Sequence, residues 1–278
     1  MNHRPALAET PLARYALIGG ALTFLTVFLF IPLGLVFVTA FKDGVDVYLA
    51  SITEPDALAA IQLTLIVTLI AVPLNIVFGL AAAWAVTKHD FRGKGILLAV
   101  IDLPFAVSPV ISGMVFILLF GASGVIGPFL ADNDIKIVFA LPGIVLATIF
   151  VTFPYVAREL IPAMEARGRE PELAALTLGA TGMQAFRLVT LPNVRWALMH
   201  GIILCTARAI GEFGAVSVVS GHIRGETNTV PLHIEILYNE YQFTAAFAVA
   251  TLLVFVAILT LALKSFIAWR ESQRKVVA

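Results

Sequence analysis

Two ionisable residues, Arg208 and Glu212, lie inside a long apolar stretch and are the first candidates for chemistry. Because they are four apart, they would share one face of a helix and could form an ion pair. Arginine also presents a planar fork of donors that fits an oxyanion. Charges at membrane depth are costly and face either a wet cavity or the protein interior. Two interpretations follow: a charged pair beside a translocation path, with Gly211 next to it, or a structural pair neutralised where helices meet.

A second group of polar residues follows in the stretch 218–229. It combines backbone amides with donors on Ser220, His222 and Arg224. Such a loop could line the route of an anion or meet an external binding protein. A solvated connector is the alternative interpretation. No metal site is expected, because His222 and His233 alone do not make one.

No catalytic or nucleotide-binding motif accompanies these residues. The sequence lacks an H-E-x-x-H helix, a G-x-x-x-x-G-K-[ST] phosphate loop and a G-x-S-x-G elbow. Cys205 is the single cysteine, which excludes an intramolecular disulfide. The net charge is zero, so nothing suggests nucleic acid. We therefore expect neither enzyme activity nor a cofactor in this chain, and any driving energy must come from elsewhere.

The elements that position these residues must be membrane helices. Of the 278 residues, 60% are hydrophobic and 13% are charged, an apolar excess that a globule of this size could not bury. The sequence predicts an all-α, polytopic membrane protein whose single domain covers residues 1–278. Six segments are long enough to span a bilayer: residues 15–41, 61–86, 95–120, 137–157, 196–220 and 244–263. The first is too long for the core of a signal peptide, so we expect a retained anchor.

The charges between the six segments set their orientation. Fourteen Lys and Arg residues fall on one side of the predicted membrane and three on the other. The positive-inside rule then places both termini in the cytoplasm. Six prolines within the segments predict kinks. Asp102, inside the third segment, could act in gating or simply have a local partner.

The loop at residues 158–195 carries helix signals and is cytoplasmic by the charge rule. Pro171 and Glu172 suit the first turn of a helix, and Gly179 suits its end. Thr181 and Gln184 fit a capping box that would open a second short helix, ending near residues 191–192. The loop is thus predicted to hold two short helices joined by a glycine turn.

This loop resembles the "EAA" loop of binding-protein-dependent ABC importer permeases. The matching pattern is Leu173-Ala174-Ala175, then Gly179, then Val189-Thr-Leu191-Pro192. The resemblance implies coupling helices that dock in a groove of a separate ATPase. It gives the ATPase-coupling residues as Glu172, Leu173, Ala174, Ala175, Gly179, Leu191 and Pro192. The family usually has glutamate where this chain has Leu173, so Glu172 is a candidate to supply the carboxylate instead.

The stretches 207–229 and 231–241 resemble the CysW-type permease family of sulfate/thiosulfate importers. The core Ala-Arg-Ala-x-Gly-Glu-Phe-Gly is shared with molybdate permeases, whereas Ser-Gly-His-Ile-Arg-Gly-Glu-Thr-Asn points to the sulfate branch. The resemblance implies the molybdate/sulfate-type permease fold and an inner-membrane location among lipids. It also implies a second permease of the CysT type, two ATPase subunits that bind ATP and Mg, and a periplasmic sulfate/thiosulfate-binding protein.

Three alternatives stay open. A molybdate or tungstate permease would work in the same way on another anion. A secondary transporter driven by an ion gradient would favour inverted repeats, and none is evident. A membrane enzyme would need clustered His, Asp or Glu residues within the spans, which the sequence lacks.

Overall fold

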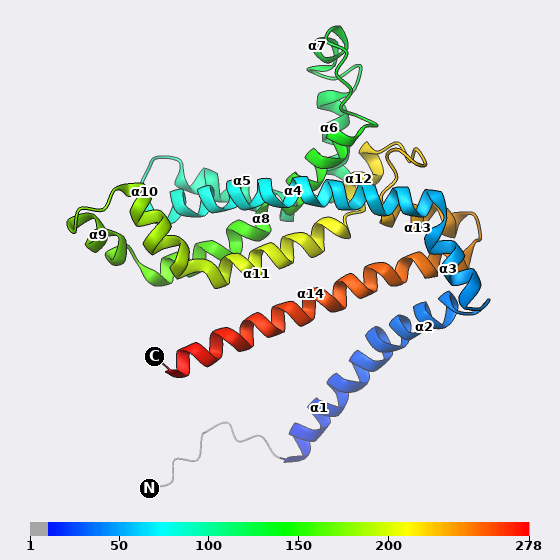
Figure 1. Cartoon of the computed structure of the whole chain (residues 1–278), viewed down its shortest axis with the longest axis horizontal. Helices are drawn as coiled ribbons and strands as arrows, with labels where there is room; N and C mark the ends of the chain where they lie inside the picture. The colour runs from blue at the N-terminus through cyan, green and yellow to red at the C-terminus, as the bar shows by residue number, and fades with distance from the viewer. Residues whose placement is uncertain (1–10, 278) are drawn as a thin grey trace.

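The computed structural model describes residues 11–277, with side chains described for residues 12–270, and this part of the chain is entirely helices and connecting loops (Figure 1). In chain order the elements are α1 (Pro11–Leu25), the π-helix η1 (Thr26–Phe30), α2 (Ile31–Ala40), α3 (Val45–Thr53), α4 (Pro55–Lys88), α5 (Lys94–Ala106), α6 (Pro109–Phe120), α7 (Gly127–Asp132), α8 (Leu141–Arg167), α9 (Glu170–Thr177), α10 (Gly182–Ala185), the π-helix η2 (Phe186–Thr190), α11 (Leu191–Ile210), α12 (Gly214–Val219), α13 (Val230–Asn239) and α14 (Phe243–Val277). The predicted all-α class is confirmed.

The centre of the bundle is formed by α4, α8 and α11. Helices α4 and α8 run parallel, because Asn75 donates to Thr152 at 2.6 Å and Thr87 to the Met164 sulfur at 3.4 Å, with the same offset in sequence. A methyl group added at Gly79 would lie 2.8 Å from Cβ of Val156. Such close approach at a small residue is typical of helix packing in lipid. Burying apolar side chains between helices gains little free energy there, because the surrounding lipid is itself apolar.

Five described helical runs are long and apolar enough to cross a membrane, or six if one bent pair is counted as a span. They run from Leu12 to Ala40, Pro55 to Lys88, Leu141 to Arg167, Gly182 to Ile210 and Phe243 to Arg270. Several extend beyond the predicted segments, since polar turns at a helix end can leave the hydrocarbon while the helix continues. Residues 1–10 of the predicted domain lie outside the described part of the chain.

The predicted third span is broken into α5 and α6, which meet at an angle of 110°. The break falls at Val107 and Ser108, both extended, with ψ of 136° and 134°. Ser108 precedes Pro109, whose ring disfavours helical geometry in the residue before it. In Figure 1 α6 and α7 project away from the bundle, so this segment is not one continuous crossing helix.

The predicted fifth span also differs. Its helix starts earlier, at Gly182, passes through the π-helix η2 without a stop, and ends at Ile210 instead of residue 220. Pro192 therefore lies in the first turn of α11 and ends no helix. The wide π-helical turn before it relieves the ring's clash with the preceding carbonyl. The loop between spans shrinks from residues 158–195 to 168–181 as a result.

Two apolar arms have little cover from the rest of the chain. In Figure 1 α1 diverges from the bundle, whereas α2 packs against α14 near its carboxyl end; none of the most apolar 18-residue stretch in the α1–α2 run is buried. The α6 arm exposes Ile111, Met114 and Leu118. Its base crosses α12 closely: a methyl group at Gly113 would lie 2.7 Å from the Ala215 carbonyl oxygen.

We therefore predict that Gly113→Ala lowers the stability of the purified protein by about 1–3 kcal/mol, because the added methyl overpacks the α6–α12 crossing. Thermal unfolding in detergent measures the effect. Gly34→Ala is the matched control, since no atom lies within 4 Å of a methyl group placed there. Equal melting temperatures for the two variants would show that the crossing relaxes freely.

Candidate functional site

The short helix α9 begins and ends as its sequence predicts. Pro171 lies in its first turn and Glu172 near its positive end. At its end the Gly179 amide donates to Leu176 and the Ala180 amide to Ala175, both at 3.0 Å. Gly179 has φ of +90°, which an L residue adopts only with strain. These bonds form a Schellman motif, so the predicted stop at Gly179 is confirmed.

The capping box at α10 is confirmed as well. The Gln184 amide donates to the Thr181 hydroxyl at 3.3 Å, and the Thr181 amide donates to the Gln184 side chain at 2.7 Å. The helix that this box opens is the start of the long run into α11. The glycine turn therefore separates α9 from a membrane helix, and α9 is the only free-standing helix among described residues 168–181.

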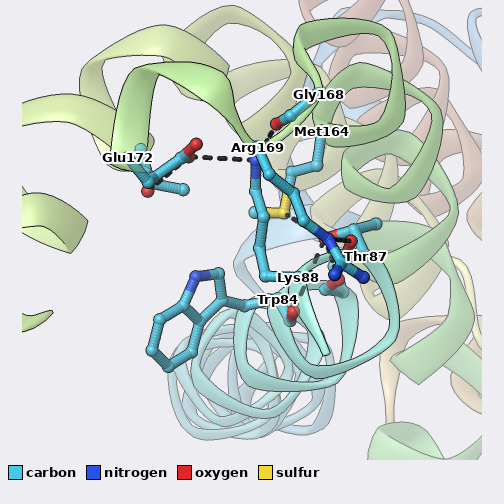
Figure 2. A network of polar contacts seen from close by, with 9 residues as sticks. Trp84, Thr87, Lys88, Met164, Gly168, Arg169 and Glu172 are labelled. Carbon is cyan, nitrogen blue, oxygen red and sulfur yellow. Dashed lines mark hydrogen bonds and ion pairs between the residues drawn. The ribbon is translucent and has the colours of Figure 1, made fainter. Parts of the chain in front are cut away.

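Glu172 turns toward the protein (Figure 2). Its Oε1 atom lies 3.0 Å from Nζ of Lys88, the last residue of α4, and accepts the Thr190 hydroxyl at 2.8 Å. Lys88 also donates to the carbonyl of Gly168, just after α8. Both charged side chains are nearly buried, with exposed fractions of 8% for Lys88 and 16% for Glu172. One ion pair thus joins α9 to the ends of α4 and α8 and to the start of the fifth span.

The ion pair shifts the acidity of Glu172. Partial burial works to raise its pKa, but the hydrogen bonds from Lys88 and Thr190 outweigh it and hold the pKa below its ordinary value. A carboxylate with a lowered pKa stabilises the fold at neutral pH. That contribution is lost only as the pH falls through the lowered pKa.

Large apolar side chains of this loop are open to solvent, and two of them, Leu173 and Leu176, line a cavity together with Lys88 and Glu172. Leu173, Leu176, Leu178 and Met183 are 57%, 46%, 89% and 60% exposed. Ala174 is exposed between them, Pro192 is exposed, and Ala175 and Leu191 are half-buried. Four large apolar side chains on a polar loop indicate a surface that another protein covers.

Arg208 and Glu212 form an ion pair of 2.7 Å between Nη1 and Oε2. Glu212 is buried, and its Oε1 atom accepts the Ala215 amide at 2.9 Å, so it caps α12. Gly211 lies in the turn between α11 and α12. This turn falls between the levels of Asn75 and Val67 on α4, near the middle of that helix. The carboxylate joins two half-helices, while Arg208 keeps 30% of its side chain exposed.

In the loop at residues 218–229, the polar residues Ser220, His222 and Arg224 have partners inside the chain. Ser220 is fully buried and accepts the His222 amide at 3.2 Å. The His222 ring lies 3.2 Å from Glu235, and Arg224 pairs with Glu240 and, at 3.9 Å, with Asp56. These contacts hold the loop to α13 and α4. The structure therefore brings Arg208, Gly211 and Glu212 together and places Ser220, His222 and Arg224 elsewhere.

Sequence reasoning missed the contact of Lys88 and did not identify the partner of Asp102. Lys88 counts only as a loop charge in the sequence, yet it holds Glu172. Asp102 has the local partner that one interpretation gave it: Arg158, at 2.8 Å, which also stacks on Phe105. The opposite charges were visible in the sequence, but pairing them required knowing which helices are neighbours.

Comparison with known proteins places the chain among transport proteins. Residues 75–271 match the family model described as "Binding-protein-dependent transport system inner membrane component". The chain is 50% identical over 263 residues to "Sulfate transport system permease protein CysW" of Escherichia coli (strain K12), covering 94% of this chain and 90% of that protein. It is 37% identical over 244 residues to the "Sulfate transport system permease protein CysT" of Salmonella typhimurium, covering 88% of each.

The fold has a solved counterpart. The chain superposes, with a TM-score of 0.74 and 17% identity over 92% of each chain, on a chain of the bacterial alginate ABC transporter in complex with an alginate pentasaccharide-bound periplasmic protein. At this identity the likeness shows the fold alone. The predicted ABC importer permease fold is thereby confirmed.

We predict that Glu212→Ala destabilises the protein by about 3 kcal/mol, because it removes both the partner of Arg208 and the cap of α12. Glu212→Gln should cost less, since its amide oxygen can still accept the Ala215 amide. Thermal unfolding of the two purified variants tests the difference. If both lose the same stability, capping of the half-helix contributes nothing.

Proposed function

Because the chain belongs to the family of binding-protein-dependent transport system inner membrane components, we propose that it is a permease subunit of an ATP-driven importer for sulfate and thiosulfate. The observation that carries the mechanism is α9. It is a free-standing helix with a fixed glycine stop, exposed leucines and a nearly buried ion pair to α4. Such a helix can be bound by another protein and can transmit that protein's movement to the membrane spans that it contacts.

The anion is inferred from the named relatives. Both are sulfate transport permeases, and the similarity to CysW extends over nearly the whole chain. Arg208 is the proposed anion contact, since its guanidinium lies at the mid-depth break with part of its surface open. Glu212 and Gly211 hold that break, and Ser220, His222 and Arg224 hold the outer loop in place.

The proposed assembly contains more than this chain. The likeness to both CysW and CysT supports a pair of related permeases, with a CysT-type protein as the second subunit. The open apolar arms α1–α2 and α6 supply surface for that pairing. Two ATPase subunits would bind ATP and Mg, and each would bind the α9 loop of one permease. A periplasmic protein would deliver sulfate or thiosulfate, and the alginate transporter complex provides a structural precedent for such delivery.

The orientation of the chain is also a proposal. The loop with α9 and the carboxyl end of α14 point toward the same end of the bundle (Figure 1). The loops at that end carry most of the Lys and Arg residues. The positive-inside rule therefore favours a cytoplasmic location for α9 and for both termini, in the inner membrane.

We predict ATP-dependent uptake of labelled sulfate when the complex is reconstituted in proteoliposomes, with ATP inside and the binding protein outside. Unlabelled thiosulfate should compete and molybdate should not. Strong competition by molybdate, with a homodimeric permease, would instead indicate a molybdate or tungstate importer. Uptake without ATP, driven by an imposed ion gradient, would contradict the ATP-coupled mechanism.

We further predict that Gly179→Asp abolishes uptake while the protein still inserts in the membrane. At φ of +90° a side chain strains the backbone by about 1–2 kcal/mol and disturbs the end of α9. Gly182→Asp, three residues on and without a positive φ, is the control and should retain transport. Normal uptake by Gly179→Asp would show that α9 does not take part in coupling.

A further inference from the structure

We propose that Lys88 is a positioning residue: its buried ion pair with Glu172 carries the movement of α9 into α4 and so couples ATP hydrolysis to transport. The inference rests on the proposed function and adds the internal link that the function requires. Without such a link, a helix gripped by an ATPase could move without moving the spans.

The first argument is the weak attachment of α9 to the bundle. None of its eight residues is fully buried, although α9 packs against η2 and its Leu173 and Leu176 line a cavity with Trp84 of α4. Its ties to α4 are polar. They are the Lys88–Glu172 pair, a hydrogen bond of 3.4 Å from Arg169 Nε to the Thr87 carbonyl, and a second ion pair, at 3.0 Å, between Arg169 and Asp90. Force on α9 can therefore reach α4 through these polar contacts, and it can reach the fifth span through the Thr190 bond and the packing of α9 on η2.

The two pairs bridge the same segments but differ in burial. Arg169 and Asp90 are 43% and 78% exposed, whereas Lys88 and Glu172 are 8% and 16% exposed. An exposed pair is screened by water and salt and constrains little. A nearly buried pair can exchange its partner for water only by moving apart, which makes it a stiff contact. The buried pair is thus the better candidate for transmitting movement.

The second argument is the position of the pair where four elements meet (Figure 2). Lys88 ends α4 and bonds to Gly168 after α8, while Glu172 of α9 accepts from Thr190 at the start of the fifth span. A displacement of Glu172 therefore acts on three membrane helices together. Asn75, Thr152 and Cys205 link the same three helices further along the bundle.

The third argument is the chemical division of α9. Its exposed residues are Glu170, Leu173, Ala174, Leu176 and Thr177, whereas Glu172 is turned inward. A carboxylate already held by Lys88 and Thr190 is not available to a cation on the ATPase. The partner would then contact the exposed residues, and the Glu172 contact lies inside the permease.

The experiment measures both sulfate uptake and ATP hydrolysis in the reconstituted complex with Lys88→Gln. We expect at least tenfold less sulfate imported per ATP, with the ATPase subunits retained and hydrolysing ATP. Lys88→Arg should recover part of the ratio, because it keeps the charge. Asp90→Asn breaks the exposed pair between the same segments and should stay within twofold of the wild type.

A double variant separates transmission from simple stability. Lys88→Met with Glu172→Leu removes both charges and leaves neither buried alone, so the melting temperature should stay near the wild-type value. The import ratio should still fall. A wild-type ratio in this variant, or loss of the ATPase subunits from Lys88→Gln, would overturn the inference. Failure of the wild-type complex to import sulfate would count against the proposed function alone. The variants would still test the inference, because each is compared with the wild type by the amount of oxyanion imported per ATP hydrolysed, for whichever oxyanion the wild type imports.

Discussion

Inside a bilayer no water is available to satisfy a broken helix, and this constraint shapes the whole molecule. The chain interrupts its helices at several points and supplies an internal partner at some of them. Glu212 accepts an amide of α12 where α11 ends. Thr64 accepts the first amide of α13, and π-helical turns carry the backbone past Pro32 and Pro192. These devices allow bends and half-helices at depths where unpaired backbone groups would cost several kcal/mol.

The same constraint governs the charges. Arg208 has Glu212, Arg158 has Asp102, and Lys88 has Glu172. Each pair joins different parts of the chain: the two ends of a helix break, two spans, or a span and the α9 loop. The Arg208–Glu212 pair resists separation because the buried Glu212 carboxylate cannot be left alone in an apolar environment. Charge pairing therefore links the moving parts of a protein that contains few polar contacts.

Local features of the fold were predictable from the sequence because they depend on neighbouring residues. The Gly179 stop and the Thr181–Gln184 capping box involve bonds over a few positions, and both appear in the structure. The continuation of the helix through Pro192 was not predictable, since a π-helical turn leaves no compositional mark. Pro109 marked the break at Ser108 in the sequence. The angle of 110° between α5 and α6, however, depends on the packing of α6 against α12. Lys88 was missed because its partner lies more than eighty positions away.

The departure from the family's usual glutamate at Leu173 can be explained by the structure. A short helix between an ATPase and a membrane domain must contact both proteins, one on each side of the helix. In this chain the carboxylate stands one position earlier, which rotates it by about 100° around the helix, from the outer face toward α4. The exposed surface keeps Leu173 and Ala174, whose contacts depend little on orientation. The inner face keeps the directional contact, where a fixed geometry is needed for movement to reach the spans.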